Sequence, residues 1–192
     1  YSRNVAGNID VYSIRVPVGV VGCITPFNFP IMVPAVMMTM AIAVGNAIVW
    51  KPSEKVPSAS LFFADLLKQA GLPDGVFNIV QGDKVAVDAI LKHPGIAAIS
   101  FVGSTHVGEY AYQTGTSNNK RVACFTGGKN HMIVMPDADL DAAASAFVSS
   151  AYGSASQRCM AVSLLLPVGE ATAQALREKV VEKIKQLKVG AY

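Results

Sequence analysis

Three cysteines occur in the 192-residue sequence, and one of them has the surroundings of a nucleophile. Cys159 directly follows Arg158 and comes after the small and polar residues 153–156. A cysteine beside a cation near the end of a segment can have a lowered pKa and react as a thiolate. A lone cysteine next to a methionine, here Met160, is also commonly a small buried hydrophobic residue. These residues alone leave both interpretations open.

The other two cysteines, Cys23 and Cys124, lie in apolar runs typical of strands, and we interpret them as buried hydrophobic residues. No two cysteines have the spacing of metal ligands, and the three histidines, His93, His106 and His131, are dispersed. The sequence therefore predicts neither a zinc site nor a disulfide framework.

A proline-flanked loop, TPFNFP at residues 25–30, follows the apolar run 18–24. In an open α/β sheet, ligands bind beyond the carboxyl ends of the strands, so this loop is well placed for a site. An amide held between two prolines suits an oxyanion donor, which makes Asn28 a candidate. The alternative is an ordinary turn in which Asn28 satisfies its own backbone.

Two further segments occupy equivalent places after predicted strands. The KPSE segment, residues 51–54, brings together Lys51 and Glu54, which can hold the hydroxyls of a ribose; the alternative is a helix start with Ser53 as its cap. The FVGS segment, residues 101–104, matches neither a dinucleotide fingerprint nor a P-loop. A glycine at such a turn can still expose helix N-terminal amides to a pyrophosphate.

Apolar runs of strand length alternate with helical periodicity in the segments that position these residues. The predicted strands are residues 18–24, 46–50, 76–80 and 96–102, and the predicted helices are residues 32–44, 57–70, 84–91 and 105–114. Strands separated by a helix require right-handed crossovers and pair in parallel. The predicted fold class is α/β, with a doubly wound and mainly parallel sheet.

The alternation restarts after Gly127-Gly128, which is the candidate domain boundary. We predict strands at residues 131–135 and 161–167. A helix capped by Asp137 or Asp139 is expected to run to about residue 151, and a last helix has its apolar face at Ala173, Leu176, Val180, Ile184 and Leu187.

Composition excludes several classes of function. With 52% hydrophobic and 15% charged residues, the chain can bury a sizeable core as one domain or one domain plus part of another. Its net charge of +3 is scattered, so no nucleic-acid partner is predicted. The uncharged residues 31–50 contain Pro34, Gly45 and Asn46, which favours a buried helix followed by a strand over a membrane span.

The beginning of the chain lacks the pattern of a signal peptide, so the cytosol or an organelle matrix is expected. The first residue is Tyr1 rather than Met, and we expect that part of the protein precedes it.

Five segments in this order, TPFNFP, KPSE, FVGS, FTGGK and QRCM, resemble the aldehyde dehydrogenase superfamily over nearly the whole chain. The residues in and around these segments look most like the CoA-acylating branch of the superfamily, which acts on methylmalonate semialdehyde. The resemblance implies a connecting, oligomer-forming strand at residues 1–17. It also implies an incomplete, Rossmann-like NAD-binding domain at residues 18–126 and the start of an α/β catalytic domain at residues 127–192.

The resemblance also implies roles for particular residues. Cys159 would be the nucleophile, with its own amide and Asn28 forming the oxyanion hole. Arg158 would bind the substrate carboxylate, or would be an ordinary surface arginine. Glu54 would favour NAD over NADP. The residues that would line the NAD site are Thr25, Phe27, Lys51, Glu54, Lys55, Ser104 and Thr126.

Two residues depart from the superfamily pattern. Phe125 stands where hydrolytic members carry a Glu, and a phenylalanine cannot activate water to cleave a thioester. This fits release of the acyl group to coenzyme A, but it also fits an impaired enzyme or a shifted register. Ser156 stands where members usually have Gly.

The resulting prediction is an NAD-dependent oxidation of malonate or methylmalonate semialdehyde, through a thioacyl-enzyme, to an acyl-CoA. No metal is expected, and the resemblance implies a homodimer or homotetramer. The alternatives are a hydrolytic aldehyde dehydrogenase that forms a free acid and a catalytically silent homologue. A Cys/His hydrolase is a weaker alternative, since nothing in the sequence pairs a histidine with Cys159.

Overall fold

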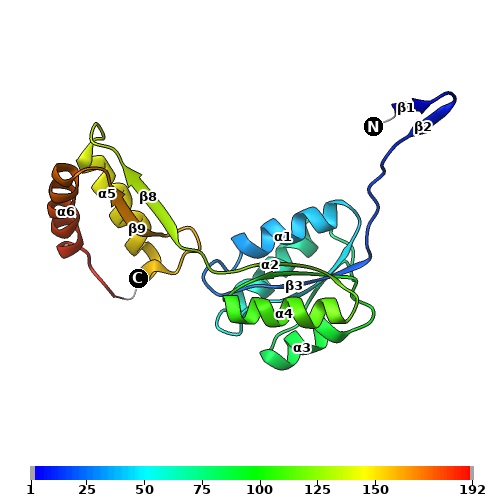
Figure 1. Cartoon of the computed structure of the whole chain (residues 1–192). Coiled ribbons are helices and arrows are strands. Elements are labelled where there is room, and N and C mark those ends of the chain that lie inside the picture. Colours follow the sequence, from blue (N-terminus) through cyan, green and yellow to red (C-terminus); the bar gives the residue numbers. More distant parts are fainter. Residues whose placement is uncertain (1–2, 191–192) are drawn as a thin grey trace. The chain divides into compact units, whose positions relative to one another are not determined.

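The computed structural model describes residues 3–190 (Figure 1). The chain divides into two compact units, Tyr1–Thr126 and Gly127–Tyr192. The first unit has a five-stranded sheet with a hydrophobic core on each face, and the second has a two-stranded sheet with a core of its own.

A five-stranded parallel sheet forms the centre of the first unit, with the strand order β5-β4-β3-β6-β7. The strands are β3 (Val20–Ile24), β4 (Ala47–Lys51), β5 (Phe77–Ile79), β6 (Ala98–Val102) and β7 (Arg121–Phe125). The predicted doubly wound α/β class is confirmed. From β3 the chain builds outward through β4 to β5, and then returns to the other side of β3 with β6 and β7. The order therefore reverses between β3 and β6, which is where such sheets bind ligands.

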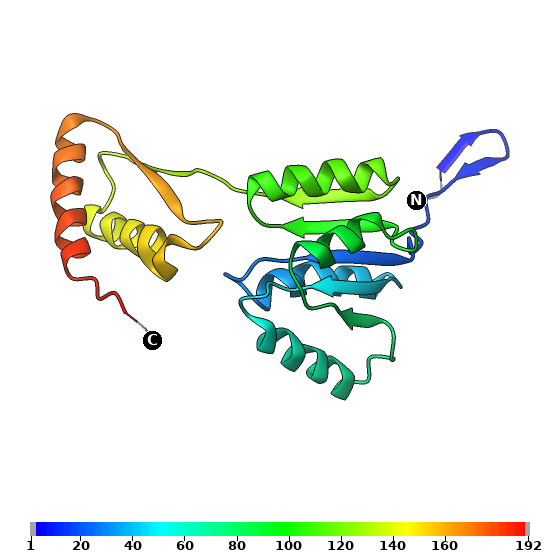
Figure 2. The same ribbon diagram turned by 90° about the horizontal axis from the view of Figure 1, so that it is seen from below.

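Helices cover both faces of this sheet (Figures 1 and 2). Helices α1 (Met32–Ala43) and α2 (Pro57–Gln69) lie on one face, over a core that contains Cys23, Ile48 and Trp50. Helices α3 (Lys84–Lys92) and α4 (Thr105–Ser117) lie on the other face. Both cores follow from strands that are apolar on two faces, since each face needs its own layer of helix.

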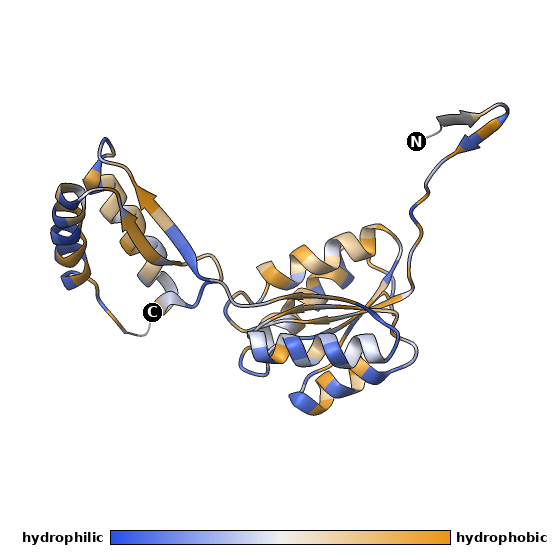
Figure 3. Ribbon diagram, in the orientation of Figure 1, coloured by the Kyte–Doolittle hydropathy of each residue, from blue (hydrophilic) through white to orange (hydrophobic). Residues whose placement is uncertain are grey.

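Helix α1 is less buried than the sequence suggested. Only Pro34 and Met38 are buried, whereas Met32, Val36 and Met40 are 54%, 68% and 68% exposed. Figure 3 shows hydrophobic colours along this helix. The helix is apolar nearly all round but packs on one side only, so its outer face stays uncovered. Within the described residues, no helix has both the length and the apolar character needed to cross a bilayer.

The helices begin at residues whose types favour a helix N-terminus. Pro57 occupies the first turn of α2, where a missing N–H costs nothing. The Asp83 side chain accepts a hydrogen bond from the Val85 amide at the start of α3. Asp139, rather than Asp137, caps the helix Leu140–Tyr152, because its side chain accepts hydrogen bonds from two amides of the first turn.

The second unit contains two parallel strands, β8 (Asn130–Val134) and β9 (Val162–Pro167), packed against two helices. Helix α5 (Leu140–Tyr152) continues into a short 3₁₀ segment, η1 (Gly153–Ser156), and helix α6 (Glu170–Lys185) follows β9. The core of this unit consists of Val134, Ala143, Ala144, Val148, Leu176 and Val180.

The N-terminal segment, predicted as a connecting strand over residues 1–17, is described from residue 3 onward, and residues 1 and 2 lie outside the described part of the chain. This segment forms an antiparallel hairpin of β1 (Arg3–Ala6) and β2 (Ile9–Val11), and residues 12–17 follow without regular structure. The chain reverses at Gly7-Asn8, where Asn8 has a φ of 65°. Asn and Gly adopt this left-handed conformation readily, which makes the pair a turn signal.

Candidate active site

A cleft of about 570 Å³ opens at the carboxyl edge of the five-stranded sheet. Its walls come from the ends of β3, β4 and β6 and from helices α3 and α4, at the point where the strand order reverses. Five of the seven residues predicted to line a cofactor site line this cleft: Thr25, Phe27, Lys51, Glu54 and Ser104. The apolar part of its lining includes Ile24, Val87, Phe101 and Val107.

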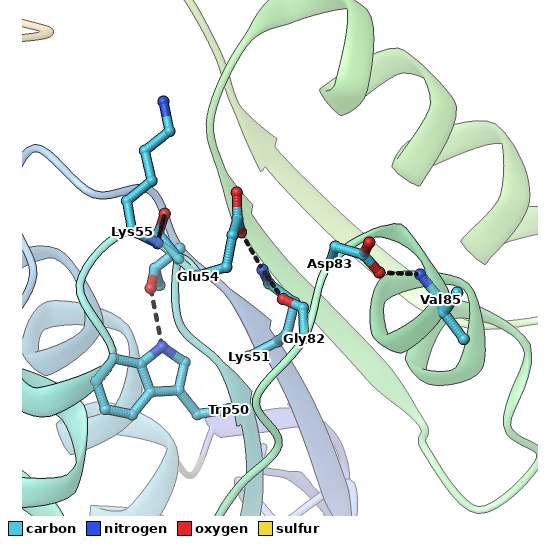
Figure 4. Close-up of polar contacts among 9 residues, drawn as sticks. Trp50, Lys51, Glu54, Lys55, Gly82, Asp83 and Val85 are labelled. Atoms are coloured by element: carbon cyan, nitrogen blue, oxygen red, sulfur yellow. Dashed lines mark hydrogen bonds and ion pairs between the residues drawn. The ribbon is translucent and has the colours of Figure 1, made fainter.

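The polar edge of the cleft is built around a buried ammonium group. The Lys51 side chain is 6% exposed, and its Nζ donates to the Gly82 carbonyl oxygen at 2.9 Å and to Glu54 Oε2 at 3.2 Å (Figure 4). The Glu54 side chain is 55% exposed. Its own backbone amide, followed by Lys51, lowers the pKa of the Glu54 carboxyl. Glu54 therefore presents a fixed, ionised carboxylate at the cleft.

The turn that follows Lys51 does not serve as a helix cap. Ser53 Oγ accepts a hydrogen bond of 3.3 Å from the Lys55 amide, whereas α2 begins at Pro57 without a side-chain cap. The ammonium of Lys55 lies 4.7 Å from the centroid of the Phe27 ring, which brings the two predicted loops together by a cation–π contact. Lys55 is not among the residues that line the cleft.

Ser104 and Thr126 have different surroundings. Ser104 immediately precedes α4 and makes no side-chain capping bond with it, which leaves the first amides of that helix free of a side-chain cap at the cleft. Thr126 is not among the lining residues; a Cβ placed on Gly108 would lie only 2.4 Å from its Cγ2. Gly108 therefore allows α4 to approach the end of β7.

Sequence reasoning missed the wall formed by α3 and α4. Lys84 and Tyr110 line the cleft, and both contact Asp88: Lys84 Nζ donates to Asp88 Oδ2, and the Tyr110 hydroxyl donates to Oδ1, each at 2.6 Å. Lys84, followed by Tyr110, lowers the pKa of Asp88. Ligands bind beyond the carboxyl ends of parallel strands, and this rule could also have found Gly82-Asp83, since these residues follow β5 at the same sheet edge.

The second unit has a cavity of its own, of about 430 Å³, which includes Arg158 and Cys159 in its lining. Cys159 is exposed. The Arg158 guanidinium lies against Gly153, where an added Cβ would come within 2.8 Å of its Cζ, and Arg158 Nε donates to Ser154 Oγ at 3.3 Å. The predicted nucleophile and the predicted carboxylate ligand thus border one cavity.

The backbone before Cys159 is strained. Ser154, Ala155 and Ser156 have φ values of 53°, 49° and 64°, all in the left-handed region that favours glycine. The Ser156 hydroxyl donates to the Ala151 carbonyl oxygen. The departure noted at Ser156 therefore falls in a run of three left-handed residues.

The first unit contains three further residues singled out in the sequence: Asn28, Cys23 and Cys124. Asn28 is half-buried in the segment between β3 and α1, within the first unit, so its pairing with Cys159 of the second unit stays a prediction. Cys23 is buried in β3, where burial raises the pKa of its thiol to about 12, and Cys124 is half-buried. Within the described residues, no group of three His, Cys, Asp or Glu side chains could hold a metal ion.

Comparison with known proteins confirms the predicted fold and family. The chain belongs to the aldehyde dehydrogenase family, whose pattern matches residues 2–192. A malonate-semialdehyde dehydrogenase of Pseudomonas aeruginosa is 56% identical over 191 residues, which is 100% of this chain and 38% of that protein. The chain thus spans well under half the length of this relative.

Two solved structures are similar over nearly the whole chain. A Sinorhizobium meliloti 1021 protein in complex with NAD, provisionally named a methylmalonate-semialdehyde dehydrogenase, is 54% identical with a TM-score of 0.94 over 100% of this chain and 40% of its own. The methylmalonate-semialdehyde dehydrogenase of Oceanimonas doudoroffii is 53% identical, with a TM-score of 0.94 over 98% of this chain and 39% of its own.

Proposed function

We propose that the intact protein is an NAD-dependent, CoA-acylating dehydrogenase of malonate or methylmalonate semialdehyde. The names of the Pseudomonas and Oceanimonas relatives support the substrate class, and the NAD bound in the Sinorhizobium structure supports the cofactor. In this proposal, residues 18–126 form most of the NAD-binding domain and residues 127–192 form the start of the catalytic domain.

The observation that carries the proposal is the Lys51–Glu54 pair in a cleft at the reversal of strand order. A carboxylate and an ammonium suit the hydroxyls of a ribose, and the start of α4, at Ser104, suits a pyrophosphate. The apolar walls suit a planar base. The chemical groups in the cleft therefore fit NAD, which accepts a hydride when it is bound.

In this proposal the covalent intermediate forms on Cys159 of the second unit. The Cys159 thiolate adds to the aldehyde carbon of the substrate, and the Asn28 amide and the Cys159 backbone amide stabilise the resulting oxyanion. Arg158, which borders the same cavity as Cys159, binds the carboxylate of the semialdehyde. After oxidation the acyl group remains on the sulfur as a thioester.

Coenzyme A, rather than water, releases this acyl group. The side chain that replaces the glutamate of hydrolytic relatives is Phe125, at the end of β7, and it cannot take a proton from water. A CoA thiolate is already nucleophilic and needs no base at that position.

Two further properties belong to the same proposal. The protein forms a homodimer or homotetramer, to which the N-terminal segment, residues 1–17, contributes. The protein acts in the cytoplasm if its source is bacterial, or in the mitochondrial matrix if its source is eukaryotic. The relatives named above come from bacteria.

The test measures NADH and the acyl product formed by the full-length protein from each semialdehyde, with and without CoA. We expect acyl-CoA, a strong dependence on CoA, and loss of NADH formation in Cys159→Ala. Cys124→Ala is the matched control and should retain activity, because Cys124 is a half-buried residue of β7. Free acid formed at full rate without CoA would instead identify a hydrolytic enzyme, and unchanged activity in Cys159→Ala would exclude this thiol as the nucleophile.

A further inference from the structure

The side chain of Trp50 contacts the loop that borders the cleft from inside the core. Trp50 is fully buried in β4, with its ring centroid 6.4 Å from that of Phe63 and 5.9 Å from that of Phe77. Its indole Nε1 donates a hydrogen bond of 2.8 Å to Thr25 Oγ1, shown by the dashed line from Trp50 in Figure 4. The largest core side chain of this face thus ends in a polar contact with a cleft residue.

Thr25 is held at two points by consecutive residues of β4. Its hydroxyl accepts from Trp50, and its backbone N–H donates to the Lys51 carbonyl oxygen at 3.2 Å. The same Lys51 uses its ammonium to hold Glu54. One threonine therefore links the TPFNFP loop to the strand end that carries the Lys51–Glu54 pair.

The residues that follow Thr25 depend on this link. Pro26 and Phe27 both line the cleft, and the proline restricts the backbone of the residue before it. Thr25 is 4% exposed, so a rotated or unpaired hydroxyl cannot turn to water without moving the loop. The bond to Trp50 favours one rotamer of Thr25, and with it one path for the loop.

We propose that Trp50 is a positioning residue for the cofactor cleft, acting through the side chain of Thr25. This proposal rests on the proposed function, because it takes NAD as the ligand of the cleft. A loop that is held in place before binding costs less free energy to order when the ligand arrives. A buried tryptophan N–H needs an acceptor, and here the acceptor is the hydroxyl of a residue that lines the cleft.

The experiment measures NAD affinity by calorimetry, and unfolding by heat, in variants of the full-length protein. Trp50→Phe keeps an aromatic ring beside Phe63 and Phe77 but removes the donor, and Thr25→Val keeps the shape but removes the acceptor. We expect each variant to bind NAD about five-fold more weakly, the loss corresponding to one hydrogen bond. The double variant should bind no more weakly than either single one, because both remove the same bond.

Two further variants separate positioning from packing. Thr25→Ser keeps the acceptor oxygen and should recover most of the affinity lost in Thr25→Val. Phe63→Leu disturbs the same aromatic cluster without touching the Trp50–Thr25 bond, so it should lower the melting temperature while NAD affinity changes less than about two-fold.

The possible failures are distinguishable. If Trp50→Phe lowers the melting temperature but binds NAD as the wild type does, the role of Trp50 is confined to the core and the proposed function stands. Additive losses in the double variant would also overturn the positioning role. If Trp50→Phe does not fold, Thr25→Val and Thr25→Ser still decide the matter. A wild-type protein that binds no NAD would overturn the proposed function together with this inference.

Discussion

The ammonium of Lys51 and the carbonyl oxygen of Gly82 are joined by a hydrogen bond of 2.9 Å. Lys51 ends β4, and Gly82 lies in the segment between β5 and α3. The bond therefore links two neighbouring loops at the carboxyl edge of the sheet, while the same ammonium also binds Glu54. Since Lys51 is a buried cation with two named acceptors, its removal should affect both the fold and the cleft.

We expect Lys51→Met to lower the free energy of unfolding by about 2 kcal/mol, because a charge-assisted bond to a carbonyl is lost in a buried place. NAD binding should weaken by about ten-fold, since Glu54 is no longer held. Urea denaturation and calorimetry measure the two effects. The control is Lys68→Met, which breaks an ion pair with Asp74. The side chains of Lys68 and Asp74 are 72% and 87% exposed. This substitution should change the free energy of unfolding by less than about 0.5 kcal/mol. Equal effects in the two variants would contradict the role given to Lys51.

The lowered pKa of Glu54 makes a prediction about acid stability. A carboxyl whose pKa is lower in the folded protein stabilises the fold above its ordinary pKa, and this contribution is lost as the pH falls through the lowered value. Wild type should therefore be more stable than Glu54→Gln at neutral pH, and the difference should shrink in acid. Urea denaturation of both proteins over a pH series measures this. A difference that stays constant or grows in acid would show that Glu54 contributes through its shape instead of its charge.

Much of the first unit could be predicted because its strands are short apolar runs separated by segments of helical length and periodicity, although α1 is apolar nearly all round. A single rule, that ligands bind beyond the carboxyl ends of the strands, then predicts Thr25, Lys51 and Ser104 at one edge of the sheet, and all three line the cleft. The rule could not tell that Thr126 packs against Gly108 instead of lining the cleft, because that depends on the contact between β7 and α4.

The features that were missed depend on packing between elements. Helix α1 was expected to be buried because it is apolar, but composition alone does not say how many layers cover a helix. The hydrogen bonds of Lys84 and Tyr110 to Asp88 join two helices, and no local sequence pattern predicts them. The left-handed conformation of Ser154–Ser156 could not be predicted either, because Ser156 in place of a usual glycine was the one sequence feature that pointed to this loop.

The three thiols should react at very different rates. Cys159 is exposed, whereas Cys23 is buried and has a pKa of about 12 because burial disfavours the thiolate. Burial also raises the pKa of Cys124. Brief treatment of the native protein with iodoacetamide near pH 8, followed by peptide mass spectrometry, should label Cys159 first and leave Cys23 unlabelled. After unfolding, all three should label. Early labelling of Cys23 in the native protein would contradict its placement in the core.

Glycine substitutions in the strained turn should stabilise the second unit, and they should do so unequally. Ala155 has a φ of 49°, a conformation that costs a non-glycine residue about 1 kcal/mol, so Ala155→Gly should raise the free energy of unfolding by a similar amount. Ser156→Gly relieves the same strain at a φ of 64° but loses the hydroxyl bond to Ala151, so its gain should be smaller. The control is Ala146→Gly, within α5, which should be destabilising by about 1 kcal/mol. Urea denaturation of the three variants measures these differences, and a destabilised Ala155→Gly would show that the turn is not strained at that position.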